Sequence, residues 1–346
     1  MRDIVMVIAD LYLPAAADGA QQAAAAFTDI PGLQSVARFG ERRALHSGWR
    51  AWLAGRLGRT DLTDVAPACV AGALLEGAPE SPAAAATRWI ASPVQLSAGL
   101  TRVHLDHRGL LSLSPEQLAV LAADFARTFG ASGFSLAPLP SGDFLLSTPG
   151  ILPLRTPEPA RCAGGLVSEV VPASAAAAPL RRLLAEIEMW LHGHAVNEAR
   201  AQRGEPPVTT LWVWGAEGRV APLRRLPREG LPQAFGRDAW LAGLWHLLGG
   251  ASSGFPAHLA EVLRPGSGCA VLVAQTGGQL RENDHATHAQ ALARLDERFV
   301  CEALRALRHG QLAGLTVILN DTRVSVGRAS RLKLWRRRTH GLKGFA

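Results

Sequence analysis

Three polar residues at helical spacing are the first candidates for chemistry in this sequence. Asn197 and Arg200 stand three positions apart, and His194 stands three positions before Asn197. If one helix continues past His194, the amide and the guanidinium point in the same direction. A guanidinium offers a planar fork of donors to phosphate or carboxylate groups. The three residues are therefore a candidate site for a small anion.

The same side chains also have a structural interpretation, which we favour on local grounds. An apolar helix expected over 180–191 turns here, through Gly204 and Pro206, into a strand expected over 209–214. A buried corner leaves backbone N–H and C=O groups outside helix and sheet, and polar side chains then supply their partners. His192 and His194 form an HxH pair, a spacing that does not suit metal binding from one helix.

A second candidate is a metal centre around Asp284, His285 and His288. A carboxylate with two nearby histidines is found in two-metal phosphatases and mutases, where paired cations hold a phosphoryl group. Asp10, at the end of the first expected strand, is the one well-placed partner in the sequence. Under this interpretation the cofactors are two divalent ions, Mn or Zn. The alternative is a polar loop before a helix, with no cofactor, because one loop does not complete two metal shells.

Motifs for other reactions are missing. The sequence has no G-x-S-x-G nucleophile motif, no GxxxxGK[ST] phosphate loop and no GxGxxG after a strand.

Positive charge is concentrated at the C-terminal end. The net charge is +7, and residues 324–346 hold seven basic residues and no acidic one. A charged edge strand resists aggregation, whereas a basic patch binds nucleic acid or anionic lipid. We favour the protected edge, because Trp335 is the one aromatic residue among these charges that could stack on a base. The residues of the nucleic-acid alternative are Arg331, Lys333, Arg336, Arg337 and Arg338.

The composition is that of a folded protein, with 346 residues, 48% hydrophobic and 19% charged. The four cysteines are widely spaced and form no CxxC pair, which favours reduced thiols and a cytoplasmic location. A membrane span needs about 18 consecutive apolar residues, and the sequence has no such run. We therefore expect a cytoplasmic protein without a membrane span.

The elements that position these residues alternate between strands and helices. Residues 4–9 are a buried strand, Ser114 and Pro115 begin a helix, and residues 269–275 and 315–326 supply a strand and a hairpin. We expect an N-terminal strand and helical region over 1–87 and a smaller α+β unit over 88–150. An α/β region with the His/Asn/Arg segment and the basic tail follows over 151–346.

Two segments resemble a known family. EIEMWLHGHAVNEARAQRGEPPVTTLWVWG looks like a signature of the bacterial RpfE-type regulatory proteins, predicted phosphoglycerate mutases of the alkaline phosphatase superfamily. SPVQLSAGLTRVHLDHRGLLSLSPEQ looks like the middle region of the same family. The likeness covers residues 88–338 and is densest over 186–215. It implies an α/β fold with a central mixed sheet flanked by helices.

The resemblance implies less about activity. Mutases of that superfamily use two divalent metals, a phosphorylated serine and scattered Asp and His ligands. Only Asp10 and the 284–288 cluster echo that set, and no serine aligns as the nucleophile. The RpfE-type proteins themselves lack the ligand set.

We therefore expect a non-catalytic regulatory protein that binds an unknown protein or a small anionic ligand. The first alternative is a metal-dependent phosphoglycerate mutase or phosphatase. The second is a nucleic-acid-binding accessory protein that acts through the basic tail.

Overall fold

The computed structural model describes residues 2–11, 29–75, 87–99, 103–150, 154–163, 165–167, 175–216, 219, 223–263, 268–275, 288–319, 321–328, 330 and 345. The chain forms two compact units, and each is discontinuous in sequence. Unit 1 contains residues 1–63, 227–237 and 248–346, and unit 2 contains residues 64–226 and 238–247. These units differ from the three continuous ranges expected from the sequence.

Unit 1 is built on a seven-stranded mixed sheet in the order β10-β9-β11-β1-β12-β13-β2. Strands β10, β9, β11, β1 and β12 are parallel, whereas β13 pairs antiparallel with both β12 and β2. The central strand, β1, is buried along almost its whole length, as its continuous apolar run predicts. The strand bounds are Asp3–Ile8 (β1), Glu41–Ala44 (β2), Gln233–Phe235 (β9), Ser252–Ser253 (β10), Ala270–Ala274 (β11), Gly314–Leu319 (β12) and Thr322–Gly327 (β13).

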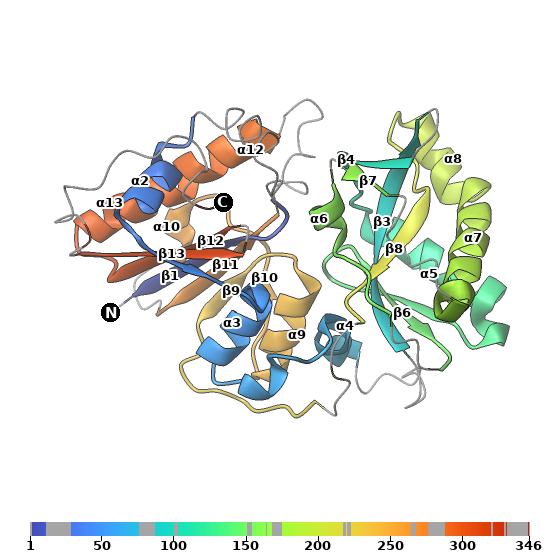
Figure 1. Ribbon diagram of the computed structural model, residues 1–346, viewed down its shortest axis with the longest axis horizontal. Coiled ribbons are helices and arrows are strands. Elements are labelled where there is room, and N and C mark those ends of the chain that lie inside the picture. Colours follow the sequence, from blue (N-terminus) through green and yellow to red (C-terminus); the bar gives the residue numbers. More distant parts are fainter. Residues whose placement is uncertain are drawn as a thin grey trace. The chain divides into compact units, whose positions relative to one another are not determined.

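Helices cover both faces of this sheet (Figure 1). Alternate residues of β1, β11 and β12 share a core with α2, α10, α12 and α13. On the opposite face, Arg323 of β13 contacts the ring of Trp52 in α3. The helix bounds are Pro31–Phe39 (α2), Gly48–Arg56 (α3), Leu259–Val262 (α10), His288–Leu295 (α12) and Glu302–Arg308 (α13), with a π-helical turn Asp296–Cys301 between the last two.

Unit 2 is built on a six-stranded sheet whose longest strand, β3 (Thr87–Ala98), pairs with β4 (Val103–Leu110), β6 (Phe144–Thr148) and β8 (Thr210–Trp214). Strands β5 (Ser135–Pro138) and β7 (Gly165–Leu166) complete the sheet.

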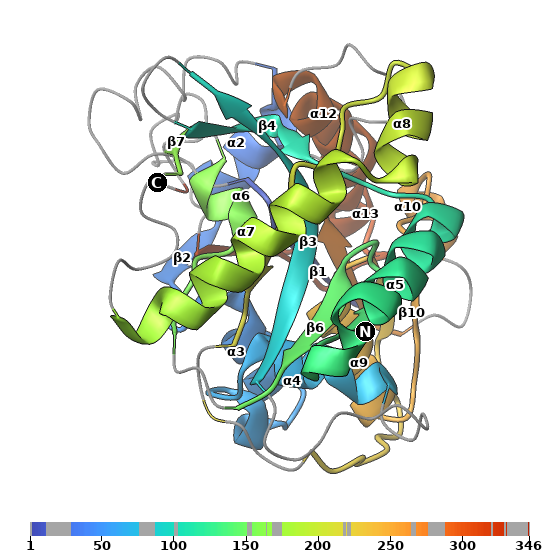
Figure 2. The ribbon, with the colours of Figure 1, turned by 90° about the vertical axis from the view of Figure 1, so that its right-hand side faces the viewer.

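Two hydrophobic layers sandwich this second sheet. One face packs against α5 (Pro115–Phe129) and α7 (Ala178–His192), which lie across β3 and β6 in Figure 2. The other packs against α4 (Pro67–Gly72) and the start of α9 (Ala239–Leu247). Helices α6 (Pro159–Cys162) and α8 (Ala195–Gln202) also belong to this unit.

The structure confirms the predicted fold class, a mixed α/β protein with a central sheet flanked by helices. The helix expected at Ser114 begins there, and Ser114 and Gln117 form a reciprocal capping box. The four cysteines are unpaired. None of the helices in the described part of the chain is long and apolar enough to cross a lipid bilayer.

Candidate functional site

The apolar helix expected over 180–191 ends close to its expected bound, and a second helix, α8, begins after His194. Helix α7 ends at His192, Gly193 follows as its C-cap, and His194 has an extended backbone. The Nδ1 atom of His194 accepts a hydrogen bond of 3.1 Å from the backbone N–H of Val196. His194 is therefore the N-cap of α8, a position at which a side-chain acceptor satisfies an unpaired backbone donor.

Asn197 and Arg200 do lie on one helix, and both are buried. The Asn197 Nδ2 atom donates to the carbonyl oxygens of Leu191 at 2.7 Å and Val208 at 2.9 Å. Its Oδ1 atom accepts from the backbone N–H of Val208 at 2.8 Å. The amide thus joins the last turn of α7 to Val208, two residues before the strand β8, and it uses both its donor and its acceptor groups in doing so.

The guanidinium of Arg200 is 4% exposed and contacts three elements of the corner. It donates to the carbonyl of Pro206 at 2.8 Å and to Oε1 of Gln117 at 3.2 Å, and it pairs with Glu205 at 3.1 Å. Burial lowers the pKa of Arg200, and the Glu205 carboxylate opposes that change. Because Gln117 belongs to the capping box of α5, Arg200 ties α8 to the start of α5.

His194, at the start of α8, contacts both α7 and α5. Its ring meets Trp190 edge to face at 4.8 Å, and Nε2 lies 3.0 Å from Oδ2 of Asp124 without the alignment of a hydrogen bond. Burial first, and the charge of Arg127 second, lower the pKa of His194 below 6.5. Arg127 is also the cation that pairs with Asp124. A neutral imidazole is therefore favoured at this position.

The contacts of the three residues match the structural interpretation of the segment. Most of the hydrogen-bonding capacity of Asn197 and much of that of Arg200 go to protein groups within the corner. These contacts satisfy buried groups of Asn197 and Arg200 without a ligand. Anion binding by His194, Asn197 and Arg200 stays a prediction.

A different edge of the fold brings together the ends of three parallel strands. Asp10 comes two residues after β1 and is 7% exposed. The residue before it, Ala9, donates its backbone N–H to the carbonyl of Ala274 at 2.9 Å. In the register of the sheet Ile8 is opposite both Ala274 of β11 and Leu319 of β12. In open α/β sheets the carboxyl ends of such strands are where ligands bind.

The remaining residues of the expected metal site, Asp284 and His285, lie outside the described residues, as does the side chain of His288. In the described part, no group of three or more His, Cys, Asp and Glu side chains has the arrangement of a metal site. The chain that leaves β11 after Gln275 leads to Asp284, so it starts at the same sheet edge as Asp10. The basic residues from Arg331 to Arg338 also lie outside the described residues.

One buried polar group was not found from the sequence. Asp296, in the π-helical turn, is fully buried and accepts hydrogen bonds from the backbone N–H groups of Gly32 at 2.7 Å and Leu33 at 2.6 Å. It therefore caps the start of α2 from more than 260 positions away. Burial raises its pKa to about 6. Sequence patterns identify a capping residue only in the positions just before its helix. A cap that comes from a distant part of the chain therefore leaves no local signal.

Comparison with known proteins gives few matches. No protein-family model and no curated protein matches the chain. Among solved structures, the chain is similar to the cofactor-independent phosphoglycerate mutase from Thermoplasma acidophilum DSM 1728, with 16% identity and a TM-score of 0.36 over 94% of this chain and 89% of that one. It is also similar to the PH0037 protein from Pyrococcus horikoshii, with 12% identity and a TM-score of 0.46 over 94% and 87%. With both TM-scores below 0.5, neither likeness bears on the chemistry of this chain.

Proposed function

We propose that the protein is a non-catalytic, cytoplasmic regulatory protein related to cofactor-independent phosphoglycerate mutases, and that it acts by binding a small anionic ligand or a protein. The relationship rests on the sequence resemblance over residues 88–338.

One observation carries the proposal. The segment with the densest resemblance, residues 186–215, folds as a corner in which Asn197 and Arg200 bond to the backbone and side chains of their own unit. A segment of this kind is retained for packing whether or not a reaction occurs nearby. The resemblance therefore brings no reacting group with it, and no serine of the sequence aligns as a nucleophile.

The experiment that tests the proposal separates binding from turnover. The purified protein is incubated with 3-phosphoglycerate and Mn²⁺, and 2-phosphoglycerate is measured against a protein-free blank. We expect no conversion, while a thermal-shift screen of phosphorylated three-carbon acids and nucleotides identifies a stabilising ligand, because a ligand that binds only the folded state raises the melting temperature. Conversion above the blank contradicts the proposal.

The second candidate is a metal-dependent phosphoglycerate mutase or phosphatase. The supporting observation is the parallel register of β1 and β11. Because of it, the chain that leads from β11 toward Asp284, His285 and His288 starts at the sheet edge where Asp10 is buried. Carboxylate and imidazole groups fit Mn²⁺ or Zn²⁺, and two such ions would hold and polarise a phosphoryl group.

This candidate is tested with p-nitrophenyl phosphate as a general probe of phosphate-ester hydrolysis. A mutase or phosphatase of this kind releases nitrophenol with Mn²⁺ or Zn²⁺ and loses that activity in Asp10→Asn and in Asp284→Asn. Glu198→Gln, on the exposed side of α8, is the control for loss of one carboxylate elsewhere. Equal background rates in all four proteins exclude the candidate.

A further inference from the structure

A pocket at the amino-terminal edge of the large sheet is independent of everything proposed above. Arg2 precedes β1, Gln311 lies shortly before β12, and α10 with Leu263 lies before β11. The pocket has a volume of about 600 Å³, which is within the usual range for small-molecule sites. Strand β1 has six residues, so the pocket and Asp10 are separated by roughly 20 Å of strand.

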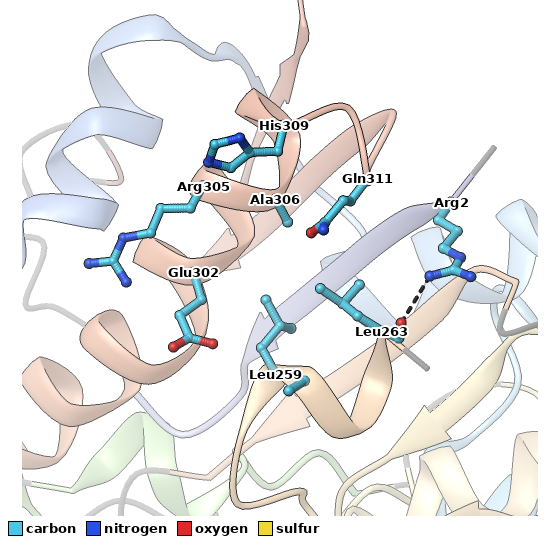
Figure 3. A pocket seen from close by; sticks show the side chains of 9 residues that line it. Arg2, Leu259, Leu263, Glu302, Arg305, Ala306, His309 and Gln311 are labelled. Carbon is cyan, nitrogen blue, oxygen red and sulfur yellow. Dashed lines mark hydrogen bonds between the residues drawn. The ribbon is translucent and has the colours of Figure 1, made fainter. Parts of the chain in front are cut away.

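The lining of this pocket has an apolar middle and two polar ends. Leu259 and Leu263 of the α10 region and Ala306 of α13 supply the apolar surface. In Figure 3, Arg2 and Gln311 lie toward one end of this surface, and Glu302, Arg305 and His309 come from the α13 side. A molecule with an apolar chain and one charged head matches such a lining better than a uniformly polar molecule does.

The Arg2 end of the pocket can donate hydrogen bonds to a ligand. One N–H of the Arg2 guanidinium donates to the carbonyl of Leu263 at 2.9 Å, which fixes the side chain beside the pocket. Among the ion pairs formed by the described residues, none involves Arg2 or Glu302. The other donors of the fork therefore remain for a carboxylate or phosphate, and the amide of Gln311 adds a neutral donor nearby.

The geometry points to a binding site for a small amphiphilic anion, with its carboxylate or phosphate at Arg2 and Gln311 and its apolar chain over Leu259, Leu263 and Ala306. Arg305, which also lines the pocket, offsets the charge of Glu302 on the α13 side.

Isothermal titration with hexanoate, hexyl phosphate and hexanol tests this site. We expect hexanoate or hexyl phosphate to bind the wild-type protein, and the stronger of the two identifies the head group. Hexanol, which has no anionic head, should bind at least about tenfold more weakly than the better ligand.

Three variants assign the site. Arg2→Gln should weaken binding of the better ligand about tenfold, whereas Arg308→Gln, an exposed arginine of α13 that does not line the pocket, should leave it unchanged. Glu302→Gln removes the one acidic residue of this lining and should strengthen binding of the better ligand, a gain that a loss of folding does not produce. Circular dichroism and the melting temperature of each variant check the fold.

Two outcomes overturn the inference. One is the absence of saturable binding of both hexanoate and hexyl phosphate to the wild-type protein. The other is binding that Arg2→Gln and Glu302→Gln leave unaltered.

Discussion

Asn197 and Val208 are joined by two hydrogen bonds that run in opposite directions, from the side-chain amide to the Val208 carbonyl at 2.9 Å and from the Val208 N–H to the side-chain oxygen at 2.8 Å. The side-chain amide thus forms with the Val208 backbone the pair of hydrogen bonds that a residue of a neighbouring strand would form, in the segment between α8 and β8. The third bond of the same amide, to Leu191 at 2.7 Å, fixes the end of α7 to this pair.

Replacing Asn197 with Ala should lower the free energy of unfolding by about 2–3 kcal/mol, because three buried backbone groups lose their partner. Urea denaturation of the wild-type protein and the variant measures the change. Glu198→Ala, at the exposed neighbouring position, should change stability by less than about 0.5 kcal/mol. Equal effects of the two substitutions would refute the structural role of Asn197.

The buried imidazole of His194 predicts acid sensitivity of unit 2. Its pKa in the folded protein lies below 6.5, so the unfolded chain takes up a proton first as the pH falls. The contribution of the neutral His194 to the free energy of unfolding is therefore fully present above pH 6.5. It decreases as the pH falls from 6.5 through the lower pKa of the folded state. In His194→Gln this part of the pH dependence should disappear, which denaturation at a series of pH values would reveal. A variant with the pH profile of the wild type would contradict the assignment.

Asp296 predicts a pH dependence of the opposite sign in unit 1. Its pKa is about 6 in the folded protein against 3.8 as the ordinary value, so between these values the folded state holds more protons. Its contribution to stability therefore decreases as the pH rises from 3.8 to 6. Asp296→Asn should remove this slope.

Asp296→Ala should cost about 1–3 kcal/mol below pH 3.8 and less above it, because the N–H groups of Gly32 and Leu33 lose their acceptor. Hydrogen exchange of the α2 amides reports both effects locally. Unchanged exchange in Asp296→Ala would show that the carboxyl group does not hold the start of the helix.

For the basic C-terminal residues we expect a protective role rather than nucleic-acid binding. Fluorescence anisotropy with a single-stranded oligonucleotide should show no affinity that falls steeply with salt. The sharpest comparison is with a variant in which Arg331, Lys333, Arg336, Arg337 and Arg338 are all Gln. Truncation is a poorer test, because Phe345 is fully buried in the core of unit 1. Salt-sensitive binding that the Gln variant abolishes would establish the nucleic-acid function instead.

The elements of this fold were predictable where local patterns determine them. The apolar run of β1, the Ser114–Pro115 helix start and the hairpin of β12 and β13 all appear as the sequence predicts. At the join of α7 and α8 the sequence left open whether one helix continues, and the structure shows that Gly193 ends the first helix and His194 caps the second.

Relations between distant residues were beyond the sequence. The pairing of Asp296 with the start of α2 and the pocket between Arg2, α10 and α13 depend on segments more than 250 positions apart. The division into units was hidden for the same reason, since residues 227–237 and 248–263 return to the first sheet while α9 joins the second. The spacing of His194, Asn197 and Arg200 is compatible with either an anion site or a structural corner; the contacts match the corner, and anion binding stays a prediction.

The central claim, that the protein binds without catalysing a metal-dependent reaction, is tested most directly by metal content. The protein is purified without chelators, equilibrated with Mn²⁺ or Zn²⁺, desalted and analysed by plasma mass spectrometry beside Asp284→Asn. We predict far less than one ion per chain and no difference between the two proteins. About two ions per chain in the wild-type protein, lost in Asp284→Asn, would contradict the claim and establish a paired-metal centre.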